Sequence, residues 1–407
     1  MKFSSVRTSW NAIVVFAVLL SACAQQSQNL QQNRNAPPTS APEDQSDVAV
    51  FNRKIEKSIN AGDSSAVFDR LDIAKITEAA NNELAVIFGR PLLNEQRTAR
   101  LADRIEESVK GIIKNGGRWD FVRVMQSSAD EQNHDCLIRL TTHDGGLSYL
   151  KLRLRKTGDD YSISDIYRYN IGMSLTETIV HLYNYTKIID RNVKYQILEK
   201  KDDYEKRFKE VWTTVKLFNS AYLNNDYDRV MDHYNNLPAE LKGDTLFLVS
   251  LIELAGAIDN EKYKEALALM HKYYDGQSMQ VYLIDYYFFN GQYDAAKAEI
   301  DKLEKLVGPE SGLDVLRASM AVYEKDYNTA MAYAKQALQK DADNKSAYDL
   351  LYDLFLDLQR YDDVVLILDI MENKFDYSYD RTLFEDEPDY AGFVKSEAYQ
   401  TWSKKLQ

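Results

Sequence analysis

The chain has 407 residues, 63 of them acidic and 50 basic, and its formal net charge is −13 at pH 7. Two cysteines are too few for a disulfide framework, and no C-x-x-C pattern for zinc or redox chemistry occurs. The length allows two folded domains with sizeable hydrophobic cores.

The first 22 residues have the pattern of a secretory signal. Lys2 and Arg7 give a basic start, and the apolar run at 12–20 is too short to span a membrane. Small residues follow and lead to Cys23. An ordinary cleaved signal followed by a chance cysteine is the alternative interpretation.

The stretch Leu20-Ser21-Ala22-Cys23 resembles the lipobox of bacterial lipoproteins. The resemblance implies that the signal is cut before Cys23 and that fatty acids such as palmitate are attached there. Two or three acyl chains make a stable membrane anchor. Ala24 at the next position, by resemblance to Gram-negative sorting, implies the outer membrane. We therefore expect an outer-membrane lipoprotein on the periplasmic side. The sequence does not distinguish this orientation from one in which the lipidated chain is flipped to the cell surface.

Residues 24–47 are rich in Gln, Asn, Ser and Pro, so with Cys23 they predict a disordered tether at 23–47. As a random coil, such a tether reaches roughly 25 to 30 Å. The folded part is therefore expected to stand off the membrane.

Residues 48–190 predict an α+β domain. Helical periodicity fits 48–61, 63–88 and 93–115. Strand patterns follow at 119–124, 136–140, 149–154 and 161–169, and alternation in 150–156 indicates that one sheet face meets water. Helices on an antiparallel meander loosely resemble the NTF2-like class. Ser174 and Glu177 form a capping box that opens a helix at 175–189.

A tyrosine recurs after a short polar turn at intervals of 36, 30, 34 and 34 residues, at Tyr227, Tyr263, Tyr293, Tyr327 and Tyr361. The clearest unit pairs a helix at 312–324 with one at 329–339, and its alanines at 318, 321, 330, 334 and 337 predict a close packing seam. This period and content resemble the tetratricopeptide repeat (TPR), which stacks into an all-α superhelical solenoid. We assign 191–378 to such repeats. An irregular helical bundle is the alternative.

The TPR resemblance implies a binding scaffold whose first helices line a groove. Setting the register by the turn tyrosines gives acidic or apolar residues at the groove positions, rather than the Lys, Arg and Asn that hold a carboxylate. We therefore expect the groove to bind a protein segment with basic and apolar side chains. Aspartates that only keep the solenoid soluble are an equal alternative. The predicted groove residues are Tyr222, Leu251, Asp285, Phe288, Tyr323, Asp349, Asp353 and Asp357.

Residues 379–407 predict an acidic loop followed by a capping helix at 390–406. The segment 341–389 holds 15 acidic and 4 basic residues, which makes nucleic acid and anionic membranes poor partners. Asp341, Asp343 and Asn344 resemble the start of a calcium loop, but Ser346 and Tyr352 replace its Gly and Glu, so an inter-repeat turn is expected.

His134, Cys136 and His143, with Asp144, lie on one predicted hairpin and form the strongest candidate zinc set, but the His143 position in the turn argues against it. No nucleophile elbow, P-loop or dinucleotide fingerprint occurs, so we expect neither an enzyme nor a cofactor. The sequence favours a membrane-anchored TPR scaffold for protein assembly. The alternative is lipid or glycan binding by the α+β domain, in a pocket lined by Trp119, Phe121 and Tyr149.

Overall fold

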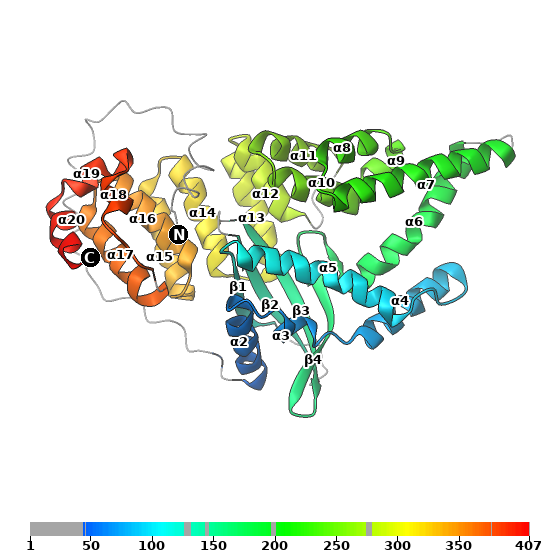
Figure 1. The fold of residues 1–407 in the computed structure, drawn as a ribbon, viewed down its shortest axis with the longest axis horizontal. Helices are drawn as coiled ribbons and strands as arrows, with labels where there is room; N and C mark the ends of the chain where they lie inside the picture. The colour runs from blue at the N-terminus through cyan, green and yellow to red at the C-terminus, as the bar shows by residue number, and fades with distance from the viewer. Residues whose placement is uncertain are drawn as a thin grey trace. The chain divides into compact units, whose positions relative to one another are not determined.

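The computed structural model describes residues 44, 46–125, 132–142, 146–196, 201–273, 279–375 and 377–406. The predicted signal segment, Cys23 and nearly all of the tether lie outside these ranges, as do His143 and Asp144. The chain divides into two compact units (Figure 1). We call Asp44–Thr142 with Leu147–Gly308 the sheet unit, and Pro309–Gln407 the C-terminal unit. Each is described by itself.

Four helices begin the sheet unit: α2 (Asp47–Asn60), α3 (Ser65–Phe68), α4 (Ile73–Phe88) and α5 (Glu95–Lys114). The prediction of one helix at 63–88 was wrong, because the chain leaves the helix at Leu71 to form a parallel bridge with Ile163. Asp72 then starts α4 by accepting a 3.0 Å hydrogen bond from the backbone N–H of Lys75.

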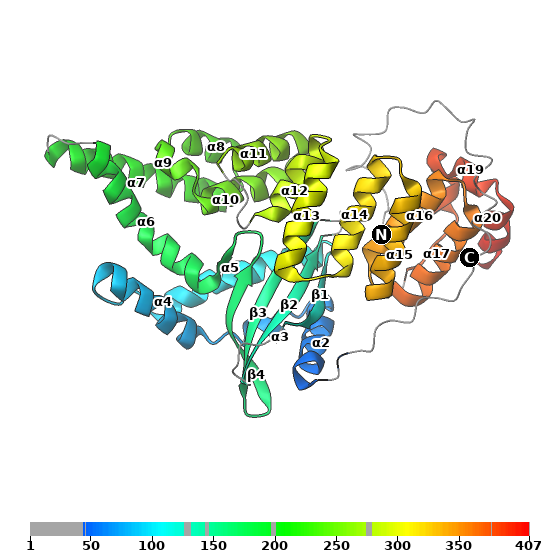
Figure 2. The same ribbon diagram turned by 180° about the vertical axis from the view of Figure 1, so that it is seen from behind.

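The predicted antiparallel meander is confirmed, with strand order β1-β2-β3-β4-β5. The strands are β1 (Arg118–Val124), β2 (Asn133–Thr141), β3 (Leu147–Thr157), β4 (Asp160–Arg168) and β5 (Met173–Ser174). One face packs on the N-terminal helices through buried residues that include Trp119, Ile138 and Leu152. Helix α5 crosses in front of the sheet in Figure 1 and behind it in Figure 2.

The opposite face of the sheet is exposed to solvent only toward one end of its strands. Arg153 and Arg155 of β3 are exposed there, as the alternation predicts. Toward the other end Arg139 is only 4% exposed and bonds Asp120 at 3.0 Å. Arg123 donates to the carbonyl of Val307 at the end of α13, so a repeat helix covers this part of the face.

Antiparallel helix pairs follow the sheet. The predicted capping box opens α6, since the Ser174 N–H donates to Glu177 at 2.7 Å and the Glu177 N–H donates to the Ser174 hydroxyl at 3.1 Å. The helices are α6 (Leu175–Gln196), α7 (Lys201–Leu223), α8 (Tyr227–Asn235), α9 (Ala239–Lys242), α10 (Thr245–Gly256), α11 (Asn260–Tyr273), α12 (Gln280–Phe289), α13 (Tyr293–Val307), α14 (Ser311–Tyr323), α15 (Tyr327–Lys340), α16 (Lys345–Asp357) and α17 (Tyr361–Phe375). No helix among the described residues is both long enough and apolar enough to cross a bilayer.

Four of the five turn tyrosines are the first residues of α8, α13, α15 and α17. Two residues before each tyrosine the backbone is left-handed, at Asn225 (φ 54°), Gly291 (68°), Lys325 (62°) and Gln359 (55°). The next N–H then bonds the carbonyl five residues back, as Asp326 does to Ala321 at 2.9 Å. The repeats therefore share one helix-ending geometry.

The turn at Tyr263 is different. The predicted turn at Glu261 and Lys262 lies inside α11, which corrects the prediction. Asp259 caps this helix early by accepting a 2.8 Å hydrogen bond from the N–H of Lys262. The turn consequently lies at 257–259.

The C-terminal unit holds the predicted alanine seam, and each of its five alanines is at most 2% exposed. The single closing helix predicted at 390–406 was wrong. The chain instead forms α18 (Thr382–Glu385), η2 (Pro388–Tyr390), α19 (Ala391–Val394), α20 (Glu397–Trp402) and η3 (Ser403–Lys405). Ser396 restarts the helix by capping the Tyr399 N–H at 3.1 Å, which lets Phe393, Tyr399 and Trp402 all pack around Phe384.

Candidate functional site

The predicted groove residues fall into two groups, one in each compact unit. Tyr222, Asp285 and Phe288 belong to the sheet unit. Leu251 belongs to the same unit, whereas the remaining four belong to the C-terminal unit: Tyr323, Asp349, Asp353 and Asp357.

In the sheet unit, two of the predicted residues bond neighbouring repeats. The hydroxyl of Tyr222 donates to Oε2 of Glu253 at 2.9 Å, and the hydroxyl of Tyr263 donates to Oδ2 of Asp285 at 2.6 Å. Half-buried Phe288 meets the rings of Phe289 and Tyr293, with centroids 5.6 and 6.0 Å away. This part of the surface therefore helps to hold the repeats together.

The placement of Leu251 in the groove was wrong, because Leu251 is fully buried in the helical core. Glu253, two residues later, is instead the exposed residue of α10 that bonds Tyr222. A shift of two residues turns a helix by more than half a turn, so a small error in register exchanges core for surface. The spacing of 31 residues between Tyr222 and Glu253, close to the repeat period, was the signal that could have found Glu253.

The turn between β4 and β5 packs against these first helices. Ile171 at the turn is 2% exposed and belongs to the same hydrophobic cluster as α7, α8 and α10. Asn170 donates to the hydroxyl of Tyr282 on α12 at 3.3 Å. The sheet thus contributes side chains to the surface that the repeat helices form.

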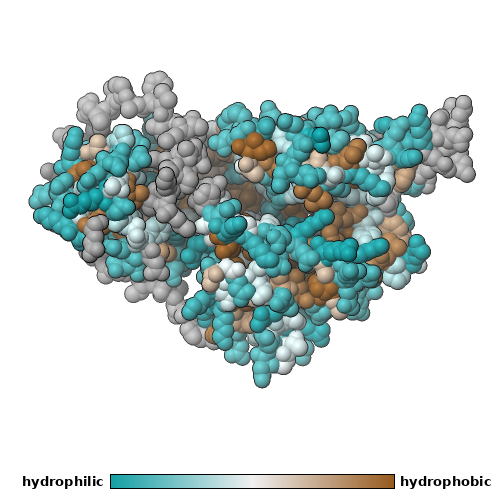
Figure 3. Space-filling model, in the orientation of Figure 1, coloured by the Kyte–Doolittle hydropathy of each residue, from teal (hydrophilic) through white to brown (hydrophobic). Residues whose placement is uncertain are grey.

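We call the surface formed by Arg168, Asn170, Tyr222, Glu253 and Tyr282 the repeat recess. Sequence reasoning found only Tyr222 among these residues. Nothing in the pattern of β4 pointed to Arg168 or Asn170, since their role depends on how the sheet packs against the helices. In Figure 3 the surface between the α11–α12 helices and α5 is hollowed, and hydrophobic residues show within the hollow.

Arg168 and Glu253 influence each other's charge state within the repeat recess. Glu253 is exposed, yet desolvation raises the pKa of its carboxyl, although Arg168 and the Tyr222 hydrogen bond oppose the shift. Desolvation likewise lowers the pKa of Arg168, with Glu253 opposing. Burial also raises the pKa of Tyr222.

A second polar cluster fixes α6 to the repeats near this surface. Nε2 of His181 lies 2.7 Å from Oδ2 of Asp244, and the hydroxyl of Tyr185 donates to Oδ1 at 2.6 Å. Asp244 also caps α10 by accepting a 3.0 Å hydrogen bond from the N–H of Leu246. Since Asp244 is largely buried, these bonds give α6 and α10 a defined separation.

In the C-terminal unit, Asp349 is engaged locally. Lys345 bonds its Oδ2 at 2.5 Å, and burial raises the pKa of the Asp349 carboxyl, opposed by Lys345. Beside Asp349 lies a small cavity of about 10 Å³, lined also by Tyr352, Tyr379 and Phe384, with room for roughly one water molecule. Asp349 thus supports the packing of the 377–390 segment on α16.

Asp353 and Asp357 remain at the surface of α16 and are both exposed. They are four residues apart on one helix, so their side chains share a face one turn apart. Tyr323, at the end of α14, is half-buried. The structure therefore retains an acidic face on this first helix, carried by Asp353 and Asp357. We call these two residues the α16 aspartates.

The ligand pocket considered for the α+β domain is not formed by the predicted residues. Trp119 and Phe121 face the helix-covered core, whereas Tyr149 pairs with Arg139 on the opposite sheet face. Side chains fill the core face of the sheet. The three residues do not converge on one space, which corrects that prediction.

The remaining candidate ligands have structural partners. Buried Cys136 accepts a 3.3 Å hydrogen bond from Asn52, and burial raises the pKa of its thiol to about 12. Asn344 caps α16 at the N–H of Ala347 at 3.1 Å and donates to Ser311 at 2.9 Å. The expected inter-repeat turn at 341–344 is confirmed. Within the described ranges, no three His, Cys, Asp or Glu side chains gather as metal ligands.

Comparisons with known proteins give little further information. No family model matches the chain, and no curated protein does. Among solved structures, the chain is similar to the crystal structure of PilW, a widely conserved type IV pilus biogenesis factor, with 14% identity and a TM-score of 0.35. The match covers 48% of this chain and 91% of that chain.

Proposed function

We propose that the chain is a bacterial envelope lipoprotein whose helical repeats act as a protein-interaction or assembly scaffold. Acylation at Cys23 anchors it to the periplasmic side of the outer membrane, and the 24–47 tether lets the folded part stand off that membrane. The signal pattern and the stacked helix pairs support this proposal. It includes no catalytic step, no cofactor and no nucleic acid.

The α16 aspartates are the observation that carries the scaffold proposal. They lie exposed on the first helix of a repeat, the helix that lines the groove in TPR arrays. A protein segment with Lys or Arg beside apolar side chains complements such a face. Electrostatic complementarity of this kind selects partners and speeds encounter more than it adds raw affinity.

Charge reversal tests the scaffold proposal. The doubly substituted chain Asp353→Lys and Asp357→Lys is expected to lose partner capture in crosslinked envelopes. Glu261→Lys with Glu265→Lys is the matched control, because both glutamates lie on α11 with the same spacing of four residues. Equal capture of the partner by both variants would contradict the proposal. The α16 aspartates would then contribute only to solubility.

A separate experiment tests the anchor. Cells given a clickable palmitate analogue are expected to label the wild-type chain and a Cys136→Ala variant but not Cys23→Ala. Label that persists in Cys23→Ala would contradict acylation at Cys23. Partition with outer-membrane rather than inner-membrane fractions tests the predicted location.

A further inference from the structure

The turn between α4 and α5 is apolar, unlike the turns inside most of the repeats. Residues 84–94 hold one charged side chain, that of Arg90, although 28% of the whole chain is charged. Four turns of the repeats are instead polar: Asn225-Asp226, Gly291-Gln292, Lys325-Asp326 and Gln359-Arg360. A run of partly exposed apolar residues in a turn is unfavourable in water and usually serves a function. The composition of the α4–α5 turn therefore indicates contact with an apolar medium.

The apolar side chains of this turn project from the sheet unit. Val86 is 88% exposed, the largest exposed fraction among the large apolar side chains of the described residues. Pro91 is also exposed, whereas Phe88 and Leu92 are half-buried and pack against the core. In Figures 1 and 2 the turn lies at the end of α4 and α5 that points away from the strands. We call Val86, Phe88, Arg90 and Pro91 the α4–α5 tip.

The tip has a fixed shape because Asn81 of α4 holds the turn from inside. Oδ1 of Asn81 accepts hydrogen bonds from the N–H groups of Leu92 and Leu93, both at 2.9 Å. Its Nδ2 donates to the carbonyl of Leu93 at 3.1 Å. Gly89 ends α4 at φ 75°, a left-handed conformation that favours glycine. A turn that is already ordered loses little conformational entropy when it binds.

Arg90 gives the tip a positive charge that no other group of the fold neutralises. Its side chain is exposed and has no hydrogen bond or ion pair among the described residues. Exposed Lys187 of α6 adds a second cation, since its Nζ lies 4.7 Å from the centroid of the Phe88 ring. The nearest carboxylates along the chain are those of Glu83 and Glu95, on the helices to either side. The tip is therefore both apolar and basic.

Two properties favour a lipid surface over a protein as the partner of the tip. Stable protein interfaces bury about 800 Å² on each partner, far more than one projecting turn offers. A bilayer needs no matching surface, because apolar side chains enter the boundary of the acyl chains while a guanidinium bonds lipid phosphate. The acidic 341–389 segment, which is a poor match for anionic membranes, belongs to the other compact unit.

We propose that the α4–α5 tip inserts into the headgroup region of a bilayer that contains anionic phospholipids. Val86 and Pro91 enter the apolar boundary, and Arg90 and Lys187 bond lipid phosphates. This inference rests on the proposed envelope location, because acylation at Cys23 keeps the tip close to a bilayer. In a chain confined in this way, even a weak contact orients the sheet unit on the membrane.

A fluorescent label on the tip tests insertion without the lipid anchor. A chain that begins at Ala24 keeps every residue that the structure describes and lacks Cys23, so buried Cys136 is its one native cysteine. Val86→Cys therefore places the environment-sensitive dye NBD at one defined position. Leu366→Cys is the matched control, because Leu366 is 56% exposed on α17.

Vesicles of phosphatidylglycerol and phosphatidylcholine are then added to each labelled chain. We expect the emission of the dye at position 86 to move to shorter wavelength and to be quenched by spin-labelled lipid, with neither change at position 366. Vesicles of phosphatidylcholine alone should bind on the order of tenfold more weakly, because they lack the net negative charge. Equal responses at both positions, or no response at position 86, would overturn the proposal. Shielding of position 86 in buffer that grows with protein concentration would assign the tip to a second copy and would overturn it as well.

Substitutions in the unlabelled chain test the two contacts separately by sedimentation with the same vesicles. Val86→Asp and Arg90→Glu are each expected to weaken binding on the order of tenfold. Both side chains are exposed, so neither change disturbs the core. Leu366→Asp should bind as the wild type does. Binding that is unchanged in Val86→Asp and Arg90→Glu would contradict the proposed contacts.

The tip and the anchor fail in different ways, because the chain that begins at Ala24 carries no acyl group. Tip insertion without palmitate labelling at Cys23 would reject the anchor and keep the tip. Palmitate labelling at Cys23 without tip insertion would reject the tip alone.

Discussion

The phenol of Tyr222 donates a 2.9 Å hydrogen bond to Glu253, 31 residues further along the chain. The bond joins α7 to α10 at equivalent places in two successive repeats. The same carboxylate faces Arg168 from β4, so the repeats and the sheet meet at one charged group. The sheet and the repeat helices of the sheet unit therefore form the repeat recess together.

The raised pKa of Glu253 predicts a pH dependence of stability. Because the folded state holds this proton more tightly than the unfolded state, the ionised form costs stability at neutral pH. Glu253→Gln is therefore expected to raise the melting temperature at pH 7. The gain should shrink as the pH falls toward about 4.3, the ordinary glutamate value, because the wild-type carboxyl is then protonated in both states. A gain that is absent at pH 7 or grows in acid would contradict the assignment.

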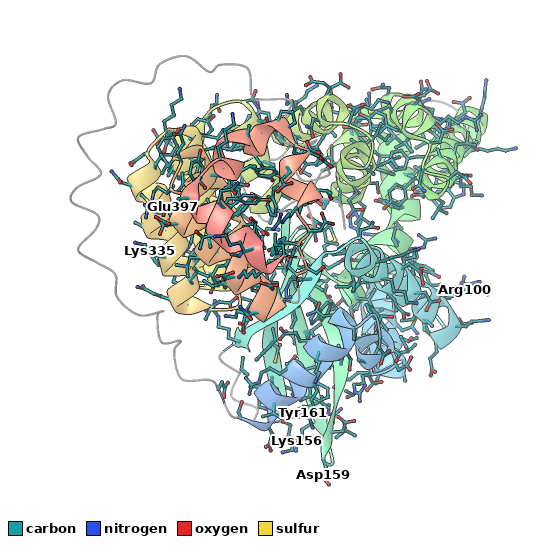
Figure 4. The ribbon with its side chains drawn as sticks, turned by 60° about the vertical axis from the view of Figure 1, so that its left-hand side comes forward. Arg100, Lys156, Asp159, Tyr161, Lys335 and Glu397 are labelled. Atoms are coloured by element: carbon teal, nitrogen blue, oxygen red, sulfur yellow. The ribbon has the colours of Figure 1, made fainter. Side chains whose placement is uncertain are left out.

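The left-handed turn residues predict stabilising substitutions. Lys325 and Gln359 carry a Cβ at φ 62° and 55°, where glycine has no steric penalty. Lys325→Gly and Gln359→Gly are each expected to stabilise the chain by about 0.5 to 1 kcal/mol, measured by urea denaturation. Lys335→Gly, in the exposed middle of α15, is the control and should cost about 1 kcal/mol. Lys335 is labelled in Figure 4. Destabilisation at all three positions would contradict the turn geometry.

The buried pair Asp120–Arg139 predicts a large effect of a single substitution. Asp120→Ala removes the carboxylate that bonds Arg139 at 3.0 Å, and Arg139 is only 4% exposed. We expect a loss of about 3 kcal/mol in the free energy of unfolding. Asp135→Ala breaks the partly exposed contacts to Lys151 and Arg153, and it should cost less than about 1 kcal/mol. Similar losses in the two variants would contradict the burial of the first pair.

Cys136 is predicted to be unreactive in the folded protein. Burial raises the pKa of its thiol to about 12, so almost no thiolate exists at pH 8. A Cys23→Ala chain incubated with iodoacetamide at pH 8 should stay unmodified by mass spectrometry until denaturant is added. Rapid alkylation of the native chain would show that the thiol is accessible and that the core around Asn52 is open.

Local patterns predicted most of the fold. The turns at Tyr227, Tyr293, Tyr327 and Tyr361, the Ser174–Glu177 capping box and the β-meander all depend on residues close in sequence, and they are confirmed, whereas the turn before Tyr263 lies earlier than predicted. The break of the predicted 63–88 helix depends instead on Leu71 pairing with Ile163, a distant partner. The division of the closing helix follows from aromatic packing around Phe384. The hydrophobic periodicity of the sequence cannot reveal either of these two long-range contacts.

The binding surface was less predictable than the fold. Tyr222 lies on α7, and Asp353 and Asp357 lie on α16, the first helices to which the repeat register assigns them, while their role in binding stays a prediction. Leu251 was misplaced by two positions. Arg168 enters the recess only because the β4–β5 turn packs on α7, α10 and α12. Such residues depend on tertiary packing between elements far apart in sequence, and no spacing rule identifies them.

The end of the β3–β4 hairpin and α5 supply exposed reference positions within the sheet unit. Figure 4 labels Lys156 and Asp159 near the end of the hairpin, and Arg100, which points outward from α5. A probe at any of these positions should report background contact within the envelope. They complement the α11 control in the decisive experiment.

The most direct test of the scaffold account is a photo-crosslinking amino acid placed at position 353 and, separately, at position 265. Both side chains are exposed, the first on α16 and the second on α11. After illumination of intact cells, the account predicts a discrete protein adduct at position 353, through a segment rich in Lys or Arg, and none at 265. Equal adducts at both positions, or no adduct at 353, would contradict it.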